Sequence, residues 1–166
     1  MSERRVVVTG LGMVSPVGVT FEKSWENILA GKSGIQPITH FPIDDFTTRF
    51  GGPIYDFDHE PYFTKKDLKK MDPFQWYGIA AGMDALDDSG LEVSDQNAKR
   101  IGVAIGSGIG GVTGIETGYA AYLKGGPRKI SPFFVPANII NMVAGNLSIW
   151  RGLKGPNISI VSACST

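Results

Sequence analysis

The sequence predicts an α/β fold with a largely buried sheet. Three short apolar runs rich in β-branched residues, at 5–9, 100–105 and 157–162, have the length and composition of buried strands. Longer segments with a helical spacing of apolar residues lie between these runs. Strands that alternate with helices are typical of a sheet covered by helices, and strands without a polar face are typical of its buried interior.

The first third of the chain begins with the run 5–9, a predicted strand that ends at a glycine-rich loop over 10–18. Thr20 is a suitable N-cap for a helix over 21–30, which the next glycine closes. Prolines and a glycine pair interrupt residues 32–60, so we expect loops with short extended pieces there.

The clearest helix signal lies in the middle of the chain. The pair Asp72-Pro73 is typical of a helix start, because the carboxylate caps backbone N–H groups and proline fits the first helical position. Apolar residues then recur at intervals of three and four as far as Gly90, namely Trp76, Ile79, Met83 and Leu86. We therefore expect one long helix between these two signals.

The second half of the chain repeats the alternation of strand and helix. A buried strand over 100–105 runs into a glycine loop over 106–111, and a helix over 112–123 follows until a Gly-Gly-Pro sequence breaks it. Residues 131–136 read as an extended apolar turn, and residues 138–150 read as a buried helix.

Composition limits the class of protein. The 166 residues have the size of one domain, and we treat 1–166 as one domain. Hydrophobic residues make up 42% and charged residues 19%, which excludes a disordered chain. The 16 basic and 16 acidic residues cancel, which argues against a general binder of nucleic acids or anionic membranes. The 22 glycines show no period, so they indicate tight turns and close backbone contacts rather than collagen or a linker.

The sequence shows neither a set of residues at the spacing of metal ligands nor a targeting signal. One cysteine excludes an internal disulfide and a four-cysteine zinc site. His40 and His59 have no partner at the spacing of metal ligands, so we expect neither a metal nor another cofactor. The N-terminal apolar run is too short for a secretory signal or a membrane span, which predicts a cytoplasmic protein without membrane association.

The glycine loops at 10–18 and 106–111 each follow a predicted strand and precede a helix, a context in which backbone N–H groups bind phosphate. Neither loop carries the Lys-Ser/Thr pair of a P-loop, and Ser15 replaces the third glycine of a dinucleotide fingerprint. A nucleotide-binding α/β module is therefore one hypothesis. Close packing of backbone at the end of a sheet is the other, and a titration with nucleotides separates the two.

Residues 65–70 form a basic run in an otherwise neutral chain. Lys66, Lys69 and Lys70 are spaced by three and four, so they project from one side if the segment is helical. Such runs are usually solvated faces. The alternative is a docking patch for an acidic partner, because opposite charge steers the encounter of two proteins.

Cys164 follows the predicted strand over 157–162. A lone cysteine is most often a small buried hydrophobic residue. This one, however, stands among small residues at the end of a strand, a placement that exposes a nucleophile at the mouth of an α/β sheet. Its position alone leaves both readings open.

Four segments together resemble the β-ketoacyl-acyl-carrier-protein synthases: Val7–Gly12 with Ser15–Gly18, Ile105–Gly111, Gly126–Pro136 and Gly155–Thr166. The third segment resembles the type II, long-chain enzymes of bacterial fatty acid synthesis, and the fourth resembles the stretch that carries their nucleophile. The resemblance covers the whole chain, whereas the family enzymes are more than twice as long. We therefore expect this chain to be their N-terminal part, ending just past the active cysteine.

The resemblance implies a thiolase-like fold, in which two similar α/β halves stack as five αβαβα layers, and a homodimer. It implies that Cys164 takes an acyl group from the phosphopantetheine of acyl carrier protein, and that decarboxylated malonyl-acyl carrier protein then condenses with it. The Cys164 backbone N–H would supply half of an oxyanion hole. Ile109 matches a bulky residue in the acyl tunnel, and Phe134 matches one that approaches the pocket across the dimer interface.

The same resemblance places Lys66, Lys69 and Lys70 where the family meets its acidic carrier protein. In the family, further catalytic groups belong to motifs that follow the cysteine: two histidines, a lysine and the second oxyanion donor. His40 and His59 do not match these motifs. We therefore expect this chain alone not to condense acyl groups. A non-catalytic ketosynthase-like partner or chain-length subunit is the alternative, although such subunits lack the nucleophilic cysteine.

Overall fold

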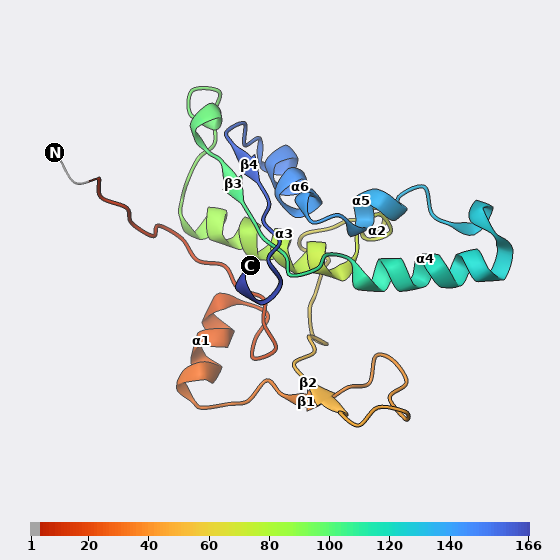
Figure 1. The fold of residues 1–166 in the computed structure, drawn as a ribbon. Coiled ribbons are helices and arrows are strands. Elements are labelled where there is room, and N and C mark those ends of the chain that lie inside the picture. The colour runs from red at the N-terminus through yellow and green to blue at the C-terminus, as the bar shows by residue number, and fades with distance from the viewer. Residues whose placement is uncertain (1–3) are drawn as a thin grey trace.

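The computed structural model describes residues 4–166, in which α3 crosses the middle of a mixed α/β arrangement (Figure 1). In that view α6 and the strands β3 and β4 lie above α3, and α1 with the strands β1 and β2 lies below it. The elements in chain order are α1 (Phe21–Leu29), β1 (Gln36–Pro37), β2 (Phe50–Gly51), α2 (Lys65–Leu68), α3 (Pro73–Asp88), η1 (Ala98–Arg100), β3 (Val103–Ala104), α4 (Val112–Gly125), η2 (Pro127–Lys129), α5 (Phe134–Asn138), α6 (Asn141–Arg151), β4 (Asn157–Ile158) and η3 (Ala163–Ser165).

The core forms where α3 packs against α6. Ile79 of α3 and Val143 of α6 are almost completely buried in one cluster. Gly78 and Gly82 bring the two helices close together, since a Cβ at these positions would lie 2.7 Å from Val143 and 2.6 Å from Leu147. The helix predicted from Asp72-Pro73 is confirmed as α3, and it ends before a glycine with a positive φ of 63°.

The strands β3 and β4 form a parallel pair, with Val103 opposite Asn157. Backbone bonds continue the pairing beyond the regular strands, from Ile105 N to Ile158 O at 3.1 Å and from Ser107 N to Ile160 O at 3.2 Å. The predicted strands at 100–105 and 157–162 are therefore confirmed as paired segments. The prediction that both are buried is wrong for the second, because Ile158 and Ile160 are exposed although α6 lies beside the pair, and in the first only Val103 is buried.

The strand predicted over 5–9 is wrong for the described residues. Val6, Val7 and Val8 are 89%, 65% and 79% exposed, and they belong to no described strand. An extended apolar run becomes a strand only where a second backbone offers hydrogen bonds, and no described segment does so here. The chain instead contacts α3 through Leu11, whose N–H donates to Asp88 Oδ2 at 2.8 Å.

The helix predicted after Thr20 is confirmed as α1, with the Thr20 hydroxyl accepting from Lys23 N at 3.2 Å. Residues 32–60 contain only the short antiparallel pair β1–β2, which confirms the predicted loops with extended pieces.

The helices α5 and α6 differ from the prediction for residues 131–150. Phe134 begins α5 instead of continuing an extended turn, and α6 begins at Asn141 because Ile139 is extended (ψ 139°). The break has a physical cause. Gln75 Nε2 of α3 donates to the carbonyls of Pro136 and Ala137, both at 2.8 Å. In a continuous helix these two oxygens would instead accept from backbone N–H groups of the next turn.

The helix predicted over 112–123 is confirmed as α4, which extends to Gly125 and ends at Gly126 with φ 74°. Asp72 joins its first turn to the start of α3, because the buried carboxylate accepts from Gly114 N at 2.6 Å and from Phe74 N at 3.3 Å. None of the helices within residues 4–166 has the length and hydropathy that a membrane crossing requires.

We expect Asp72→Ala to lower the free energy of unfolding by about 2–3 kcal/mol, because two N–H groups lose a charged acceptor. Urea unfolding of the variant and the parent measures this difference. Asp72→Asn keeps a side-chain oxygen and should lose less than half as much. Asp95→Ala is the matched control, since it removes only an exposed ion pair with Lys154 at 3.1 Å and should cost less than about 1 kcal/mol. An unchanged midpoint for Asp72→Ala would contradict this role.

Candidate active site

Cys164 is exposed on a sharp turn that follows β4. Its neighbour Ala163 has a φ of 50°, the only left-handed residue other than glycine among residues 4–166. Hydrogen bonds of the backbone N–H groups hold the turn, from Ser165 N to Ser162 O at 3.1 Å, from Thr166 N to Ala163 O at 3.2 Å and from Ser162 N to Thr166 Oγ1 at 2.8 Å. A side chain on a turn with this backbone at the end of a strand projects outward, as a nucleophile must.

The glycine loop over 106–111 lies beside this turn. A Cβ at Gly106 would collide with the methyl group of Thr166, and a Cβ at Gly108 would touch Ala163 O at 3.6 Å. Glycine therefore allows two backbones to approach closely here. This agrees with the hypothesis that the glycine loops serve close packing of backbone at the end of a sheet.

Three backbone N–H groups of this loop, among them those of Gly110 and Gly111, donate within the protein. Gly110 N donates to Ser107 Oγ at 3.1 Å, and Gly111 N donates to Asn138 O at 3.0 Å. In the loop over 10–18, the carboxylate of Asp88 accepts from Leu11 N, where a phosphate would need the same donor. These internal hydrogen bonds in both loops argue against the hypothesis of a nucleotide-binding module, because a phosphate would need the same N–H donors.

Ile109 and Phe134 lie on different elements. Ile109 is 72% exposed, on the loop whose neighbouring glycine contacts the turn of Cys164. Phe134 is half-buried at the start of α5, and its ring lies against Gly118 of α4. The contacts therefore bring the loop of Ile109 to Cys164, whereas they attach Phe134 to α4.

A buried polar network holds α5, and the sequence analysis did not identify it. Gln75 is fully buried, and its Oε1 accepts from Asn146 Nδ2 at 3.2 Å while its amide group binds α5. Asn138 is also buried, and its side chain lies against Gly111 and Gly114 at the start of α4. The sequence contains one signal for this network, a glutamine on the apolar side of a predicted helix. A buried side-chain amide requires hydrogen-bond partners, so such a glutamine indicates a buried polar contact.

The basic run begins with a capped turn of helix. Thr64 and Asp67 form a capping box at α2, and the hydrogen bond from Thr64 lowers the pKa of the Asp67 carboxyl. Lys66 and Lys69 are exposed. Lys70 instead lies with its Nζ 5.2 Å from the ring centroid of Phe133.

Two pockets flank this basic segment. One, of about 300 Å³, lies between Lys70, Met71, Phe133 and Trp150. The other, of about 250 Å³, brings Lys69 and Lys129 together with Gly118 and Phe134. Lys69, Lys70 and Phe134 therefore belong to one region of the surface, next to α5.

Tyr62 attaches the segment before α2 to α3. Its hydroxyl donates to the Asp84 carboxylate, with both oxygens at 3.0 Å. Burial, reinforced by this carboxylate, raises the pKa of Tyr62 from 10.0 to about 12. Burial likewise raises the pKa of Asp84. The folded protein therefore favours a protonated Tyr62.

The two histidines lie elsewhere. His40 contacts Tyr55 beside β1, and His59 packs edge-on against Trp76. Across residues 4–166, no group of three or more histidine, cysteine, aspartate or glutamate side chains has the arrangement of a metal site.

Comparison with known proteins identifies the family. The family profile described as "Beta-ketoacyl synthase, N-terminal domain" matches residues 3–166. The chain belongs to the β-ketoacyl synthase family. Its resemblance to that family, stated above from four segments, is therefore confirmed.

Several relatives are similar over the whole of this β-ketoacyl synthase domain. The 3-oxoacyl-[acyl-carrier-protein] synthase 2 of Vibrio cholerae serotype O1 is 64% identical, and that of Coxiella burnetii is 52% identical. In both cases all of this chain aligns with 40% of the relative. The chain thus spans about two fifths of the length of these curated relatives.

Solved structures of ketosynthases share the fold. A β-ketoacyl synthase from Burkholderia phymatum is 26% identical with a TM-score of 0.78, covering 98% of this chain and 40% of its own. A type II polyketide ketosynthase in complex with its acyl-carrier protein is 26% identical with a TM-score of 0.71, covering 92% of this chain and 40% of its own. The predicted class, the N-terminal part of a thiolase-like α/β fold, is confirmed.

The Tyr62–Asp84 contact predicts a pH dependence. Between pH 10 and 12 the unfolded β-ketoacyl synthase domain loses the Tyr62 proton while the folded domain keeps it, so stability falls as the pH rises through this window. Urea unfolding of the parent and of Tyr62→Phe, repeated across pH, measures the effect. The stability difference between them should be constant at pH 8 to 9 and should shrink above pH 10. Parallel curves throughout would contradict the assignment.

Proposed function

We propose that the whole protein is a β-ketoacyl-acyl-carrier-protein synthase of the type II, long-chain class, an acyltransferase of fatty acid elongation. The observation that carries this proposal is the exposed Cys164 on a left-handed turn after β4, beside the glycine loop. The relatives named 3-oxoacyl-[acyl-carrier-protein] synthase 2, at 64% and 52% identity, support it. Because the chain spans about 40% of their length, the proposal concerns the whole protein.

The first step transfers the acyl group to Cys164. Its thiolate attacks the carbonyl carbon of the acyl thioester on the phosphopantetheine of acyl carrier protein, and a C–S bond forms. The negative oxygen of the tetrahedral intermediate accepts a hydrogen bond from the Cys164 N–H. The bond to the phosphopantetheine sulfur then breaks, and that sulfur leaves with the electron pair and takes the proton that Cys164 gave up.

The second step forms the new carbon–carbon bond. Malonyl-acyl carrier protein loses CO₂, and the electron pair of the broken bond becomes a carbanion stabilised as its enolate. The carbanion attacks the carbonyl carbon of the acyl-cysteine, and the C–S bond to Cys164 breaks as the intermediate collapses. The thiolate is thereby restored, so acylation and condensation alternate at one sulfur atom. The acyl chain itself occupies a pocket lined by Ile109 and, across the dimer interface, by Phe134 of the second copy.

The partner of the basic segment is acyl carrier protein. Exposed Lys66 and Lys69, together with Lys70, present positive charge to an acidic surface, which orients the incoming carrier. A ketosynthase of similar fold has been solved in complex with its acyl-carrier protein, which supports this type of partner.

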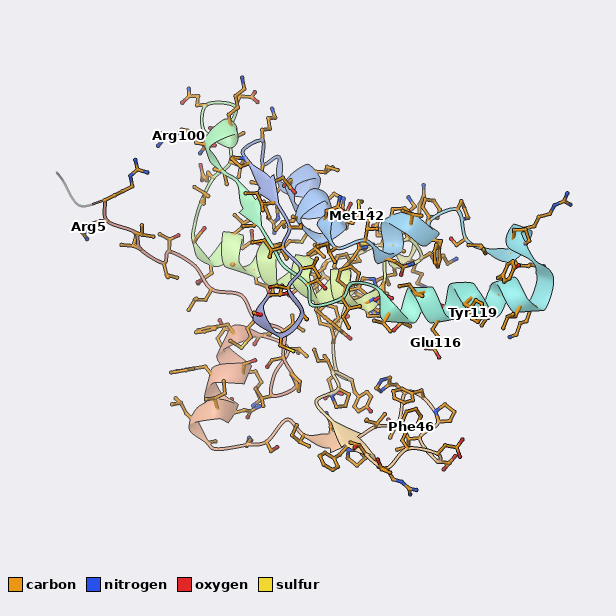
Figure 2. All side chains as sticks on the ribbon, viewed as in Figure 1. Arg5, Phe46, Arg100, Glu116, Tyr119 and Met142 are labelled. Atoms are coloured by element: carbon orange, nitrogen blue, oxygen red, sulfur yellow. The ribbon has the colours of Figure 1, made fainter. Side chains whose placement is uncertain are left out.

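A homodimer completes the proposal. Ile115, Tyr119 and Leu123 recur every four residues on α4, where they are exposed on one side of a helix that projects from the molecule (Figures 1 and 2). An exposed apolar side of this kind is suited to a second copy of the protein. The enzyme acts in the cytoplasm and uses no metal or organic cofactor, because its substrates arrive on phosphopantetheine.

The alternative of a non-catalytic chain-length subunit has weaker support. A structure described as the ishigamide ketosynthase/chain length factor shares the fold, at 25% identity with a TM-score of 0.77. A subunit without chemistry, however, has no need for an exposed thiol on a left-handed turn.

We expect Cys164→Ala to abolish the acyl-enzyme and to slow condensation by at least about a thousandfold, since the nucleophile is gone. Mass analysis of the peptide that contains position 164, after incubation of the whole protein with acyl-acyl carrier protein, measures the first effect. Ser165→Ala is the matched control, because it removes only the hydroxyl that donates to Ser162 O and keeps both the thiol and the backbone bonds of the turn. Undiminished condensation by Cys164→Ala would refute the proposed nucleophile.

We expect Lys66→Glu combined with Lys69→Glu to raise the KM for acyl-acyl carrier protein about tenfold or more, because two attractive charges become repulsive. The rate with a small acyl thioester that lacks the carrier should stay unchanged, which separates docking from misfolding. Arg100→Glu is the matched control, since Arg100 lies on η1, away from α2 (Figures 1 and 2). If both charge reversals raised KM equally, the basic segment would not be the docking surface.

A further inference from the structure

The ring of Phe134 lies against the backbone of α4 at Gly118. A Cβ at position 118 would stand 2.6 Å from Phe134 Cδ2 and closer still to Cε2, which is nearer than real Cβ contacts come. The glycine thus leaves a recess in α4 that the edge of the ring fills. Figure 1 shows α5, where Phe134 begins the helix, next to the first half of α4.

Backbone conformation does not explain a glycine at this position. Gly118 lies within the helix α4 and is not among the residues with a positive φ. Helix propensity favours alanine over glycine in such a place. The contact with the ring is therefore the feature of the structure that requires a residue without a side chain.

The backbone of α5 cannot retreat to make room for a larger residue. Gln75 Nε2 holds the carbonyls of Pro136 and Ala137, both at 2.8 Å, and Asn138 O accepts from Gly111 N at 3.0 Å. These bonds fix the far end of a helix only five residues long. The first turn of α4 is held as well, because Gly114 N donates to Asp72 Oδ2 at 2.6 Å. A methyl group added at position 118 would therefore be accommodated by movement of the Phe134 ring.

We propose that Gly118 is a positioning residue that sets the acyl-chain preference of the enzyme through Phe134. This inference rests on the proposed function, in which Phe134 lines the acyl pocket. The ring can line that pocket only with the surface that α4 does not cover. A residue that pushes the ring off α4 therefore narrows the pocket, and the longest acyl chains lose the most.

The test compares the whole protein with its Gly118→Ala variant, using a short-chain and a long-chain acyl-acyl carrier protein. We expect the ratio of kcat/KM for the long substrate to that for the short one to fall about tenfold, the usual size of a one-methyl change in an apolar pocket. Gly145→Ala is the matched control, because it also replaces a helical glycine but has nothing within 4 Å of the added Cβ. Its ratio should equal that of the parent.

A second variant separates positioning from damage to the fold. In the Phe134→Leu background there is no ring to displace, so adding Gly118→Ala should leave the ratio of that background unchanged. An unchanged ratio for Gly118→Ala alone, or the same fall in the Phe134→Leu background, would overturn the inference. A parent protein that forms no condensation product would overturn the proposed function instead, and this outcome is visible before any variant is compared.

Discussion

A buried polar contact at the start of α3 organises the rest of the structure. Asp72 binds the first turn of α4, and Gln75 binds the carbonyls of α5 and the side chain of Asn146 on α6. These groups are shielded from water, so an alternative arrangement that left them unpaired would be costly. One helix terminus therefore contacts three other helices. The basic segment that precedes it is attached to the same point.

The parts of the fold that sequence reasoning predicted well depend on local chemistry. Thr20 and Asp72 cap the helices that follow them, and Gly126 ends α4 with a positive φ, because capping involves residues within one turn of each other. The failures depend on distant partners. Val6 to Val8 have no second backbone to pair with among residues 4–166, and α5 separates from α6 because Gln75, some sixty residues earlier, binds two of its carbonyls.

The same division applies to the candidate site. The position of Cys164 after a strand followed from the pattern of apolar residues, as did the nearby glycine loop. The left-handed backbone at Ala163 did not, because alanine gives no local signal for it. The contact between Phe134 and Gly118 was likewise invisible, since it depends on how α5 is anchored. The roles of Ile109, Phe134 and the lysines come from the family resemblance and stay predictions.

The register of the β3–β4 pair has a consequence for the order in which the chain folds. Residue 103 pairs with residue 157, so the loop that closes when these strands meet contains α4, α5 and α6. Closing such a loop costs chain entropy that is recovered only when the helices between the strands have packed. The turn of Cys164 follows the second strand, so its sulfur acquires a defined environment late. During synthesis Cys164 therefore emerges only after both paired strands and the crossover between them.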